Sequence, residues 1–402
     1  MPASVTVPAA VAAGPPPKVG GGTRLVSLDA YRGFIMLAMA SAGFGIPAVA
    51  RQFPDSIWSR LAWHVDHVPW TGGSFWDMIQ PSFMFMVGVA LPFSVARRRE
   101  QGDSFRQLLT HAVLRSVVLV VLGVFLASAY DKRTNFVFTN VLAQIGLGYT
   151  FVFLLVARGP RLQVAALLAI LIGYWLAFRL HPPPPAGLDL AAHGLKPDDL
   201  LPGTFVHWTK SWNFAATFDR WFLNLFPREK PFVFNAGGYQ TLNFIPSIGT
   251  MLLGLLAGEL LRSPTPPPLI LRRLLIAGTA CLALGLVAGS TVCPIVKRIW
   301  TPSWTLYAGG WTLWMLAAFY WIIEIRGARR WTLPLVVVGM NSIAIYLLYQ
   351  LMSGWIRSTL KIHLPDAWFA APYGELVGRT SVWVILWLIC AWLYRRKIFL
   401  KI

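Results

Sequence analysis

The chain has 402 residues, of which 56% are hydrophobic and only 13% are charged. Soluble domains carry about 25% charged residues, so this composition excludes an ordinary soluble protein and predicts a polytopic membrane protein. The formal net charge of +19 does not indicate nucleic-acid binding, because the arginines stand in short clusters between apolar segments rather than on a soluble domain. The three cysteines lie far apart in the sequence and predict neither a disulfide framework nor a CxxC metal site.

Residues 1–23 are rich in proline, alanine and glycine, and they lack the charged start and apolar core of a signal peptide. We expect them to form a disordered cytoplasmic tail. Residues 24–402 are then expected to form a single transmembrane domain, because they contain no recognisable internal repeat and no soluble domain.

Long apolar segments are the clearest signal in this domain. A spanning helix needs about 20 mostly apolar residues to cross about 30 Å of hydrocarbon. The sequence therefore predicts an all-α bundle of about ten transmembrane helices, with eleven as the alternative count. The expected spans are residues 28–48, 74–96, 108–128, 136–157, 162–180, 243–261, 269–290, 304–325, 332–352 and 376–394.

The basic residues between these spans predict the orientation of the chain, because cytoplasmic loops carry an excess of lysine and arginine. If every predicted span crosses the membrane, the loops lie alternately on its two sides. One side then holds most of the basic residues, namely Arg97, Arg98, Arg99, Arg106, Arg158, Arg161, Arg262, Arg272, Arg273, Arg326, Arg329, Arg330, Arg395, Arg396, Lys397 and Lys401. We expect this side, and with it both termini, to be cytoplasmic.

The longest loop, residues 181–242, is expected on the opposite, extracytoplasmic side. It begins with the stiff run "HPPPP" and continues with Trp208, Trp212 and Trp221 among polar residues. We expect an ordered cap over the outer surface. Two interpretations stay open, an aromatic belt of short interfacial helices or a part in substrate binding.

The stretch "WHVDHVPWTGGSFWDMIQPSFMFMVG", residues 63–88, places two histidines and two aspartates directly before an apolar span. A neutral imidazole such as that of His67 can take a proton from an amine or attack an acyl group, although a lone loop histidine is more often structural. Asp77 has either a functional role or a capping role with Ser74. His64 and His67 have a spacing that suits a metal, but no third ligand follows at a recognisable spacing, so no metal site is predicted.

Five further polar residues at or within the spans are candidates for binding. Asp29 and Arg32 lie on one face at the start of the first span, where they can pair with each other, or Arg32 can meet a phosphate from the cytosol. Arg115 is a weaker candidate for the same role, with snorkelling as the alternative. Gln144 and Asn341 are amides within spans, for which an interhelical hydrogen bond is the default.

Four motifs occur in a characteristic order from Arg24 onward: "RLVSLDAYRGF", "HVPWTGGSFWDMIQPSFMFMVG", "GMNSIAIYLLYQ" and "LYRRKIFLKI". Together they resemble the heparan-alpha-glucosaminide N-acetyltransferase family and its bacterial relatives. The resemblance implies a membrane-embedded acyltransferase that takes acetyl groups from cytosolic acetyl-CoA and delivers them to an extracytoplasmic sugar. It also implies that His67 is the active-site histidine, in the pattern H-x-x-W-x-G followed by Asp77.

The chain departs from the pattern of this family in three places. "NAGGYQTLNF" replaces an Asp-Pro-Glu-Gly motif, Ala143 and Gln144 replace a Gln-Arg pair, and Tyr349 and Gln350 replace a His-Glu pair. Charges are lost at each of these places, which indicates an altered acceptor or an altered chemistry. A fold does not determine its substrate.

We therefore expect an acetyl-CoA-dependent N- or O-acetyltransferase in a bacterial inner membrane, with acetyl-CoA as co-substrate and no metal. Its expected partners are a sugar or glycan acceptor and the lipid bilayer, and homodimer formation stays open. Catalysis is assigned to His67 and to Asp77, which would orient the imidazole or cap its helix. Substrate or cofactor binding is assigned to Asp29, Arg32, Trp70, Arg115, Gln144 and Asn341, with Trp70 walling the cavity or stacking on the sugar.

Two other functions compete with this interpretation. A small-solute transporter or channel would line its route with the same polar residues. An inactive scaffold of the same fold would be consistent with the lost charges. The sequence does not determine the acceptor, the choice between N- and O-acylation, the oligomeric state, or the choice between direct transfer and an acetyl-histidine intermediate.

Overall fold

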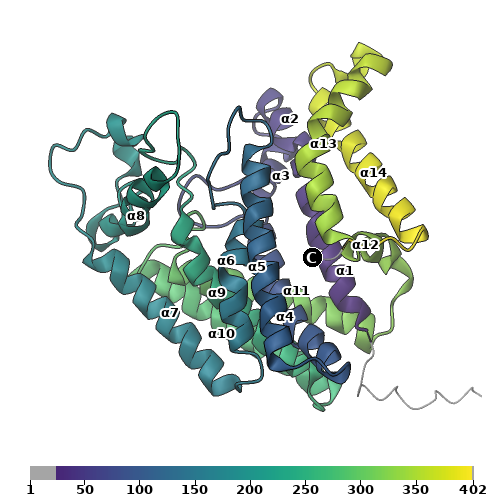
Figure 1. Cartoon of the computed structure of the whole chain (residues 1–402). Coiled ribbons are helices and arrows are strands. Elements are labelled where there is room, and N and C mark those ends of the chain that lie inside the picture. The colour runs from purple at the N-terminus through teal and green to yellow at the C-terminus, as the bar shows by residue number, and fades with distance from the viewer. Residues whose placement is uncertain (1–23, 401–402) are drawn as a thin grey trace, which may run out of the picture.

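The computed structural model describes residues 24–400, so the expected tail 1–23 and Lys401 lie outside the described residues. Within residues 24–400 all regular elements are helices and no strand occurs (Figure 1). The α-helices are α1 Val26–Ala40, α2 Ile46–Gln52, α3 Ile57–His64, α4 Ile79–Glu100, α5 Phe105–Ser128, α6 Val141–Leu154, α7 Pro160–Leu180, α8 Phe214–Phe222, α9 Phe244–Arg262, α10 Pro267–Thr291, α11 Pro302–Tyr320, α12 Leu333–Gly339, α13 Ser342–His363 and α14 Gly374–Arg395. Short 3-10 turns lie between them, including η2 Trp76–Met78 and η7 Thr241–Asn243.

Eight helical segments in this part of the chain are long and apolar enough to cross a membrane. A ninth is obtained if the bent pair α12 and α13 is counted as one span. The membrane character predicted from the sequence therefore agrees with the structure, whereas the count of ten spans is not confirmed.

The shortfall arises at α6, which replaces the expected span 136–157. The side chain of Asn140 accepts a hydrogen bond from the backbone N–H of Ala143 and so caps the helix at its first turn. The apolar residues before Asn140 are consequently not helical. The resulting 14-residue helix is about 21 Å long, at about 1.5 Å per residue, and does not reach across about 30 Å of hydrocarbon.

The expected span 332–352 is broken rather than continuous. Asn341 has φ −121° and interrupts the helix, so that α12 and α13 meet at 64°. Its amide Nδ2 donates to the carbonyl of Ile398 at 3.2 Å, and its Oδ1 accepts from the backbone N–H of Leu400 at 3.2 Å. Asn341 therefore connects the "GMNSIAIYLLYQ" motif to residues 398–400. It does not lie inside a continuous span, where the expected interhelical hydrogen bond would have placed it.

Glycines allow the central helices to pack backbone against backbone. A Cβ at Gly88 of α4 would lie 2.0 Å from the carbonyl oxygen of Met251 in α9, and one at Gly254 would lie 2.0 Å from that of Phe85. Only residues without a Cβ permit such an approach, which is a common packing mode of membrane helices. The same device joins α1 to α12, where a Cβ at Gly339 would lie 1.9 Å from the carbonyl oxygen of Asp29.

Burial separates the central helices from the peripheral ones. In the most apolar window of the segments that contain α4 and α9, 72% of the residues are buried, whereas in α5, α10 and α14 only 22% are. A helix that is apolar all round and yet exposed on one side has a lipid-facing surface. The peripheral helices therefore enclose a central group of α1, α4, α9 and α11.

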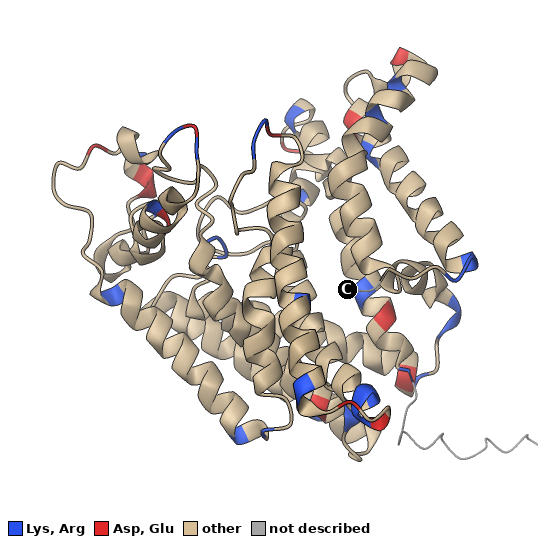
Figure 2. Ribbon diagram, viewed as in Figure 1, with Lys and Arg blue, Asp and Glu red and all other residues tan. Residues whose placement is uncertain are grey.

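Residues 181–242 form a folded segment at one end of the bundle, around α8 (Figure 1). Trp208 is 1% exposed, and the buried carboxylate of Asp219 accepts a hydrogen bond from the backbone N–H of Thr241 at 2.9 Å, which fastens α8 to η7 before α9. The arginine cluster at the end of α4 and the basic start of α7 lie at the opposite end (Figure 2).

Candidate active site

The segment between α3 and α4 is held in place by one carboxylate. Oδ2 of Asp77 accepts hydrogen bonds from the backbone N–H of Val68 at 3.2 Å, the backbone N–H of Ser74 at 3.1 Å and the Ser74 hydroxyl at 3.1 Å. The Ser74 hydroxyl lies 3.4 Å from the backbone N–H of Asp77, so the two residues form the reciprocal contacts of a capping box at η2. The loop that carries His67 is thereby fastened to the start of α4.

The other oxygen of Asp77 contacts the imidazole of His67. Oδ1 lies 2.6 Å from Nδ1, and the Asp77 side chain is only 2% exposed. A carboxylate can only accept hydrogen bonds, so Nδ1 carries the proton and the lone pair remains on Nε2. Asp77 therefore both caps its helix and orients the imidazole, two roles that the sequence had left as alternatives.

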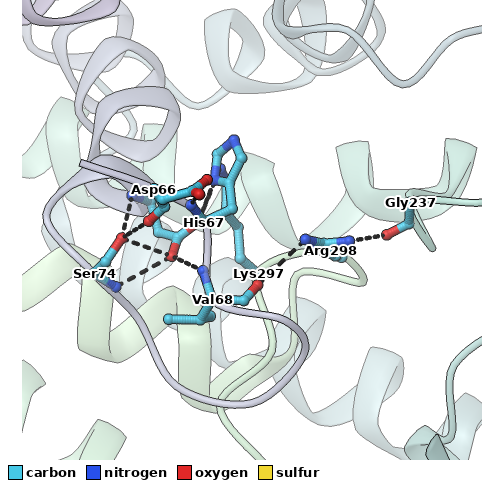
Figure 3. Close-up of polar contacts among 8 residues, drawn as sticks. Asp66, His67, Val68, Ser74, Gly237, Lys297 and Arg298 are labelled. Carbon is cyan, nitrogen blue, oxygen red and sulfur yellow. Dashed lines mark hydrogen bonds and ion pairs between the residues drawn. The ribbon is translucent and has the colours of Figure 1, made fainter. Parts of the chain in front are cut away.

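A third residue, Lys297, completes the cluster from the loop between α10 and α11 (Figure 3). Its Nζ lies 3.3 Å from Oδ1 of Asp77 and 3.2 Å from Nδ1 of His67. Since Nδ1–H already donates to Asp77 over the shorter distance, the ammonium and the imidazole share the same carboxylate oxygen. The close approach of Nζ to Nδ1 is then a consequence of this sharing and not a hydrogen bond.

Burial lowers the pKa of Lys297 to about 8, while the charge of Asp77 opposes part of this shift. At pH 7 the amine therefore still carries its proton. The ammonium offsets the charge of the carboxylate that orients the imidazole. A neutral imidazole with a free Nε2 is the form that can act as a base or a nucleophile.

Arg298 and Gly72 attach this loop to the histidine loop. Arg298 donates to the carbonyl of Val68 at 3.3 Å and to that of Gly237 at 2.7 Å (Figure 3). The backbone N–H of Gly72 donates to the carbonyl of Ile295 at 2.8 Å. The cluster of His67, Asp77 and Lys297 is thus built from two loops that are held together by several hydrogen bonds.

His67 lies at a cavity of about 370 Å³ between α1, the start of α4, the start of α6 and α13. Most of its wall is apolar or aromatic, and the polar groups are few, which is the usual composition of a small-molecule site. The lining residues are Met36, Met39, His67, Trp76, Ile79, Gln80, Phe83, Thr139, Asn140, Val141, Tyr239, Lys297, Tyr346, Tyr349 and Gln350. We call this space the histidine cavity.

Two of the three family departures face the histidine cavity. Tyr239, within "NAGGYQTLNF", and the pair Tyr349 and Gln350 all belong to its lining. The third departure lies elsewhere, because Gln144 is fully buried and its Nε2 donates to the carbonyls of Phe138 and Thr241 at 2.7 and 3.1 Å. Gln144 thus joins α6 to η7, as expected for an interhelical amide.

Trp70 does not line the histidine cavity, which corrects its assigned place in the wall. Its indole N–H donates to the carbonyl of Trp208 at 3.1 Å, and its side chain packs in the core under the 181–242 segment. Gly238 packs directly on its ring, and a Cβ there would lie 2.6 Å away. Trp76 takes its place in the cavity wall and meets the His67 ring edge to face at 6.5 Å between centroids.

The arginines expected to bind phosphate lie apart from this cluster. Arg32 pairs with Asp29 at 3.6 Å, and Asp29 also pairs with Arg24 at 2.5 Å. Arg115 stacks on Tyr149 at 4.7 Å from the ring centre and donates to its hydroxyl, while its Nε is buried without a partner among the described residues.

Lys297 and Arg298 were missed in the sequence, where they count only as basic loop residues. They carry one signal that could have identified them. They form a dibasic pair in a short loop, "VCPIVKRIW", on the side of the membrane assigned to His67, where basic residues are otherwise sparse. A basic residue at the end of a span, on the same side of the membrane as the candidate base, is as good a functional candidate as an acidic residue at that position.

The chain is similar to the heparan-alpha-glucosaminide N-acetyltransferases of human and mouse, each 24% identical over 433 and 430 residues respectively, which covers 94% of this chain. It spans 60% of the length of these relatives. No family model matches the chain. The similarity extends over nearly the whole of this chain.

Proposed function

We propose that the chain is a membrane-embedded acetyltransferase that moves an acetyl group from acetyl-CoA to the amine or hydroxyl of a sugar. The observation that carries this proposal is the contact between His67 and the buried Asp77 at the wall of the histidine cavity, with Nε2 free of any described hydrogen-bond partner. The similarity to two N-acetyltransferases supports the choice of reaction.

The proposed reaction follows from the protonation state of His67. The acceptor nitrogen or oxygen attacks the thioester carbonyl carbon, and its proton passes to Nε2. The new C–N or C–O bond forms, the C–S bond breaks, and coenzyme A leaves as a thiolate that takes up the proton. Asp77 holds the imidazole in the tautomer with a free Nε2, which this step requires. The ammonium of Lys297 offsets part of the negative charge of Asp77.

A second route uses the same atom. Nε2 attacks the thioester itself, coenzyme A leaves, and the acceptor then removes the acetyl group from the imidazole. Incubating the protein with acetyl-labelled acetyl-CoA in the absence of acceptor separates the two routes. Label that stays on wild-type protein but not on a His67→Ala variant indicates the acetyl-histidine route, and its absence from both indicates direct transfer.

The proposed function is tested with purified protein, acetyl-CoA and a series of amino sugars. We expect saturable binding of acetyl-CoA and release of coenzyme A that depends on the sugar. A small-solute transporter or channel has no reason to bind acetyl-CoA, and an inactive scaffold would not release coenzyme A. Failure to bind acetyl-CoA would exclude the acetyltransferase.

We further propose that acetyl-CoA enters from the cytoplasmic side and that its phosphates meet Arg32 and Arg115. Arg115 makes no ion pair with any residue that the structure describes, so its charge can meet an anionic ligand. Guanidinium groups suit phosphate because they present several donors in a fixed plane.

Replacing Arg32 with alanine is expected to weaken acetyl-CoA binding about tenfold, the effect of losing one charged hydrogen bond. Asp29 keeps Arg24 as a partner, so the fold should survive. Isothermal titration of the purified variant measures the affinity. Arg161→Ala serves as the control, because Arg161 is an exposed basic residue at the start of α7. Unchanged affinity in Arg32→Ala would leave the Asp29–Arg32 pair with a structural role only.

The proposed orientation places residues 181–242 outside the cell, both termini in the cytoplasm and the chain in a bacterial inner membrane. Single cysteines at the exposed positions Asp198 and Gln101 test this placement in intact cells. A membrane-impermeant thiol reagent should label Asp198→Cys and leave Gln101→Cys unlabelled until the cells are lysed. The reverse pattern would invert the topology and would place His67 on the donor side.

A further inference from the structure

The histidine cavity lies between two groups of helices. α13 packs mainly on α1 and α14, whereas α6 packs mainly on α4, α5 and α9. Both groups line the cavity, with Asn140 and Val141 from the start of α6 and Tyr346, Tyr349 and Gln350 from α13. Gln350 lines the cavity and is also exposed, which places an opening of the cavity where α13 faces the start of α6. We call it the lateral opening.

A single side chain bridges the two groups above the lateral opening. The hydroxyl of Tyr130, in the loop after α5, donates to the carbonyl of Leu351 in α13 at 2.6 Å. α5 and α13 run next to each other toward the end of the bundle where residues 181–242 lie (Figure 1). Tyr130 is 77% exposed, and one such hydrogen bond contributes only about 1 kcal/mol. The bridge can therefore open at little cost.

The lateral opening lies below the ends of the helices that flank it. Nδ2 of Asn140, at the start of α6, donates to the carbonyl of Gly123 in α5 at 2.8 Å. α5 continues for five residues beyond Gly123, to Ser128, which is about 7.5 Å of helix. α13 continues for thirteen residues beyond Gln350, to His363, which is about 20 Å. The opening therefore lies within the depth that α5 spans, and α5 is long and apolar enough to cross a membrane.

The surface of α5 at this depth is apolar and exposed. Val121 is 62% exposed and Phe125 is 52% exposed, one before and one after Gly123 in the sequence. On α13, Trp355 is 63% exposed and lies one turn beyond Leu351. Tryptophan is enriched where a membrane meets water, so this position fits the boundary of the hydrocarbon. Acyl chains of the bilayer can then reach the lateral opening.

The polar and apolar groups of the histidine cavity come from different parts of the chain. His67 and Lys297 belong to loops, whereas Met36, Met39 and Phe83 belong to α1 and α4. A ligand that fits this distribution has a polar head at His67 and an apolar part between the helices. A sugar joined to a lipid chain has this polarity, and a free sugar does not.

We infer that the acceptor sugar is carried on a membrane lipid, which enters through the lateral opening below Tyr130 and keeps its chain between α6 and α13 while the amine or hydroxyl lies at His67. This inference rests on the proposed function and adds the carrier of the acceptor to it. A soluble sugar has no need of an opening at the depth of the bilayer.

The first test measures binding without turnover, in His67→Ala protein reconstituted into phosphatidylcholine vesicles. The probe is glucosamine joined to a long alkyl chain that carries a diazirine near the sugar. After illumination, we expect labelling at the start of α6 and at residues 346–351 to exceed labelling of the exposed apolar residues Leu284 and Val287 of α10. Unlabelled alkyl glucosaminide should suppress this excess, whereas an alcohol with the same chain should not.

The second test closes the opening in active protein. Tyr130→Cys and Leu351→Cys are combined with Cys281→Ala, because Cys281 is partly exposed while Cys293 and Cys390 are buried. A short bifunctional thiol reagent then replaces the hydrogen bond by a covalent bridge. We expect loss of acetyl transfer to the alkyl glucosaminide, recovery on reduction, and retained transfer to methyl glucosaminide. The same cysteines treated with a monofunctional reagent are the control and should retain both activities.

Three results would overturn the inference: labelling that is equal on α10, labelling that the alkyl glucosaminide does not suppress, or a covalent bridge that affects both acceptors alike. The labelling experiment does not depend on acetyl transfer. Specific labelling without transfer to either acceptor would therefore contradict the proposed function and support the lipid site, whereas transfer without specific labelling would do the reverse.

Discussion

Replacing His67 with alanine is expected to lower the rate of acetyl transfer by at least about 100-fold, the lower bound for the loss of a general acid–base group. The expectation rests on the orientation of the ring, because Asp77 holds Nδ1 at 2.6 Å and leaves Nε2 at the cavity. The initial rate of coenzyme A release, measured at saturating acetyl-CoA, gives the effect directly.

The control for this substitution is His64→Ala. His64 is an exposed histidine three residues earlier, at the end of α3, and it does not line the histidine cavity. It should retain near-normal transfer, and both variants should bind acetyl-CoA with wild-type affinity. Near-normal transfer by His67→Ala would return His67 to a structural role in its loop and would remove the centre of the mechanism.

Replacing Lys297 with methionine is expected to move the acidic limb of the pH–rate profile to higher pH, by about one pH unit or more. Without the ammonium, the full charge of Asp77 acts on the imidazole, which then retains its proton to a higher pH. Only the neutral imidazole is active, so the rate at a given acidic pH falls. Because the wild-type amine itself loses its proton near pH 8, the difference between variant and wild type should narrow above that pH.

A purely structural role for Lys297 would lower stability and leave the pH profile in place. The variant should still fold, because Asp77 keeps His67, Val68 and Ser74 as hydrogen-bond donors. Thermal unfolding of Lys297→Met and of a Lys297→Gln variant measures the stability cost. Lys132→Met, at an exposed lysine before α6, is the matched control and should change neither property. An unshifted acidic limb in a folded variant would contradict the proposed electrostatic role.

The altered wall of the histidine cavity bears on the choice of acceptor. Tyr239, Tyr349 and Gln350 occupy the places where the sequence departs from the family pattern, and all three line this cavity. We propose that these three side chains meet the acceptor, because they line the same cavity as His67.

Much of the fold could be predicted from the sequence because its signals are local. An apolar run of about 20 residues has only one stable arrangement in a bilayer, a helix whose backbone groups bond within the segment. The apolar segments of α4, α5, α9, α10 and α14 were located in this way. Two predicted spans were wrong because of single asparagines. Asn140 caps α6, so this helix begins later than predicted, and Asn341 interrupts the ninth predicted span. Neither residue is a strong helix breaker by itself.

The candidate site likewise has one part that the sequence predicts and another part that only the tertiary structure shows. His67 and Asp77 are ten residues apart and share one motif, so their association could be proposed from the sequence. Lys297 lies 230 residues from His67, and its charge meets Asp77 only because α10 and α11 return the chain to the loop before α4. The exchange of Trp70 for Trp76 in the cavity wall likewise depends on the 181–242 segment, which buries one indole and leaves the other at the cavity. Contacts between distant segments depend on how the helices pack against one another. A pattern of apolar residues predicts where the helices are, but it does not predict which residues meet when they pack.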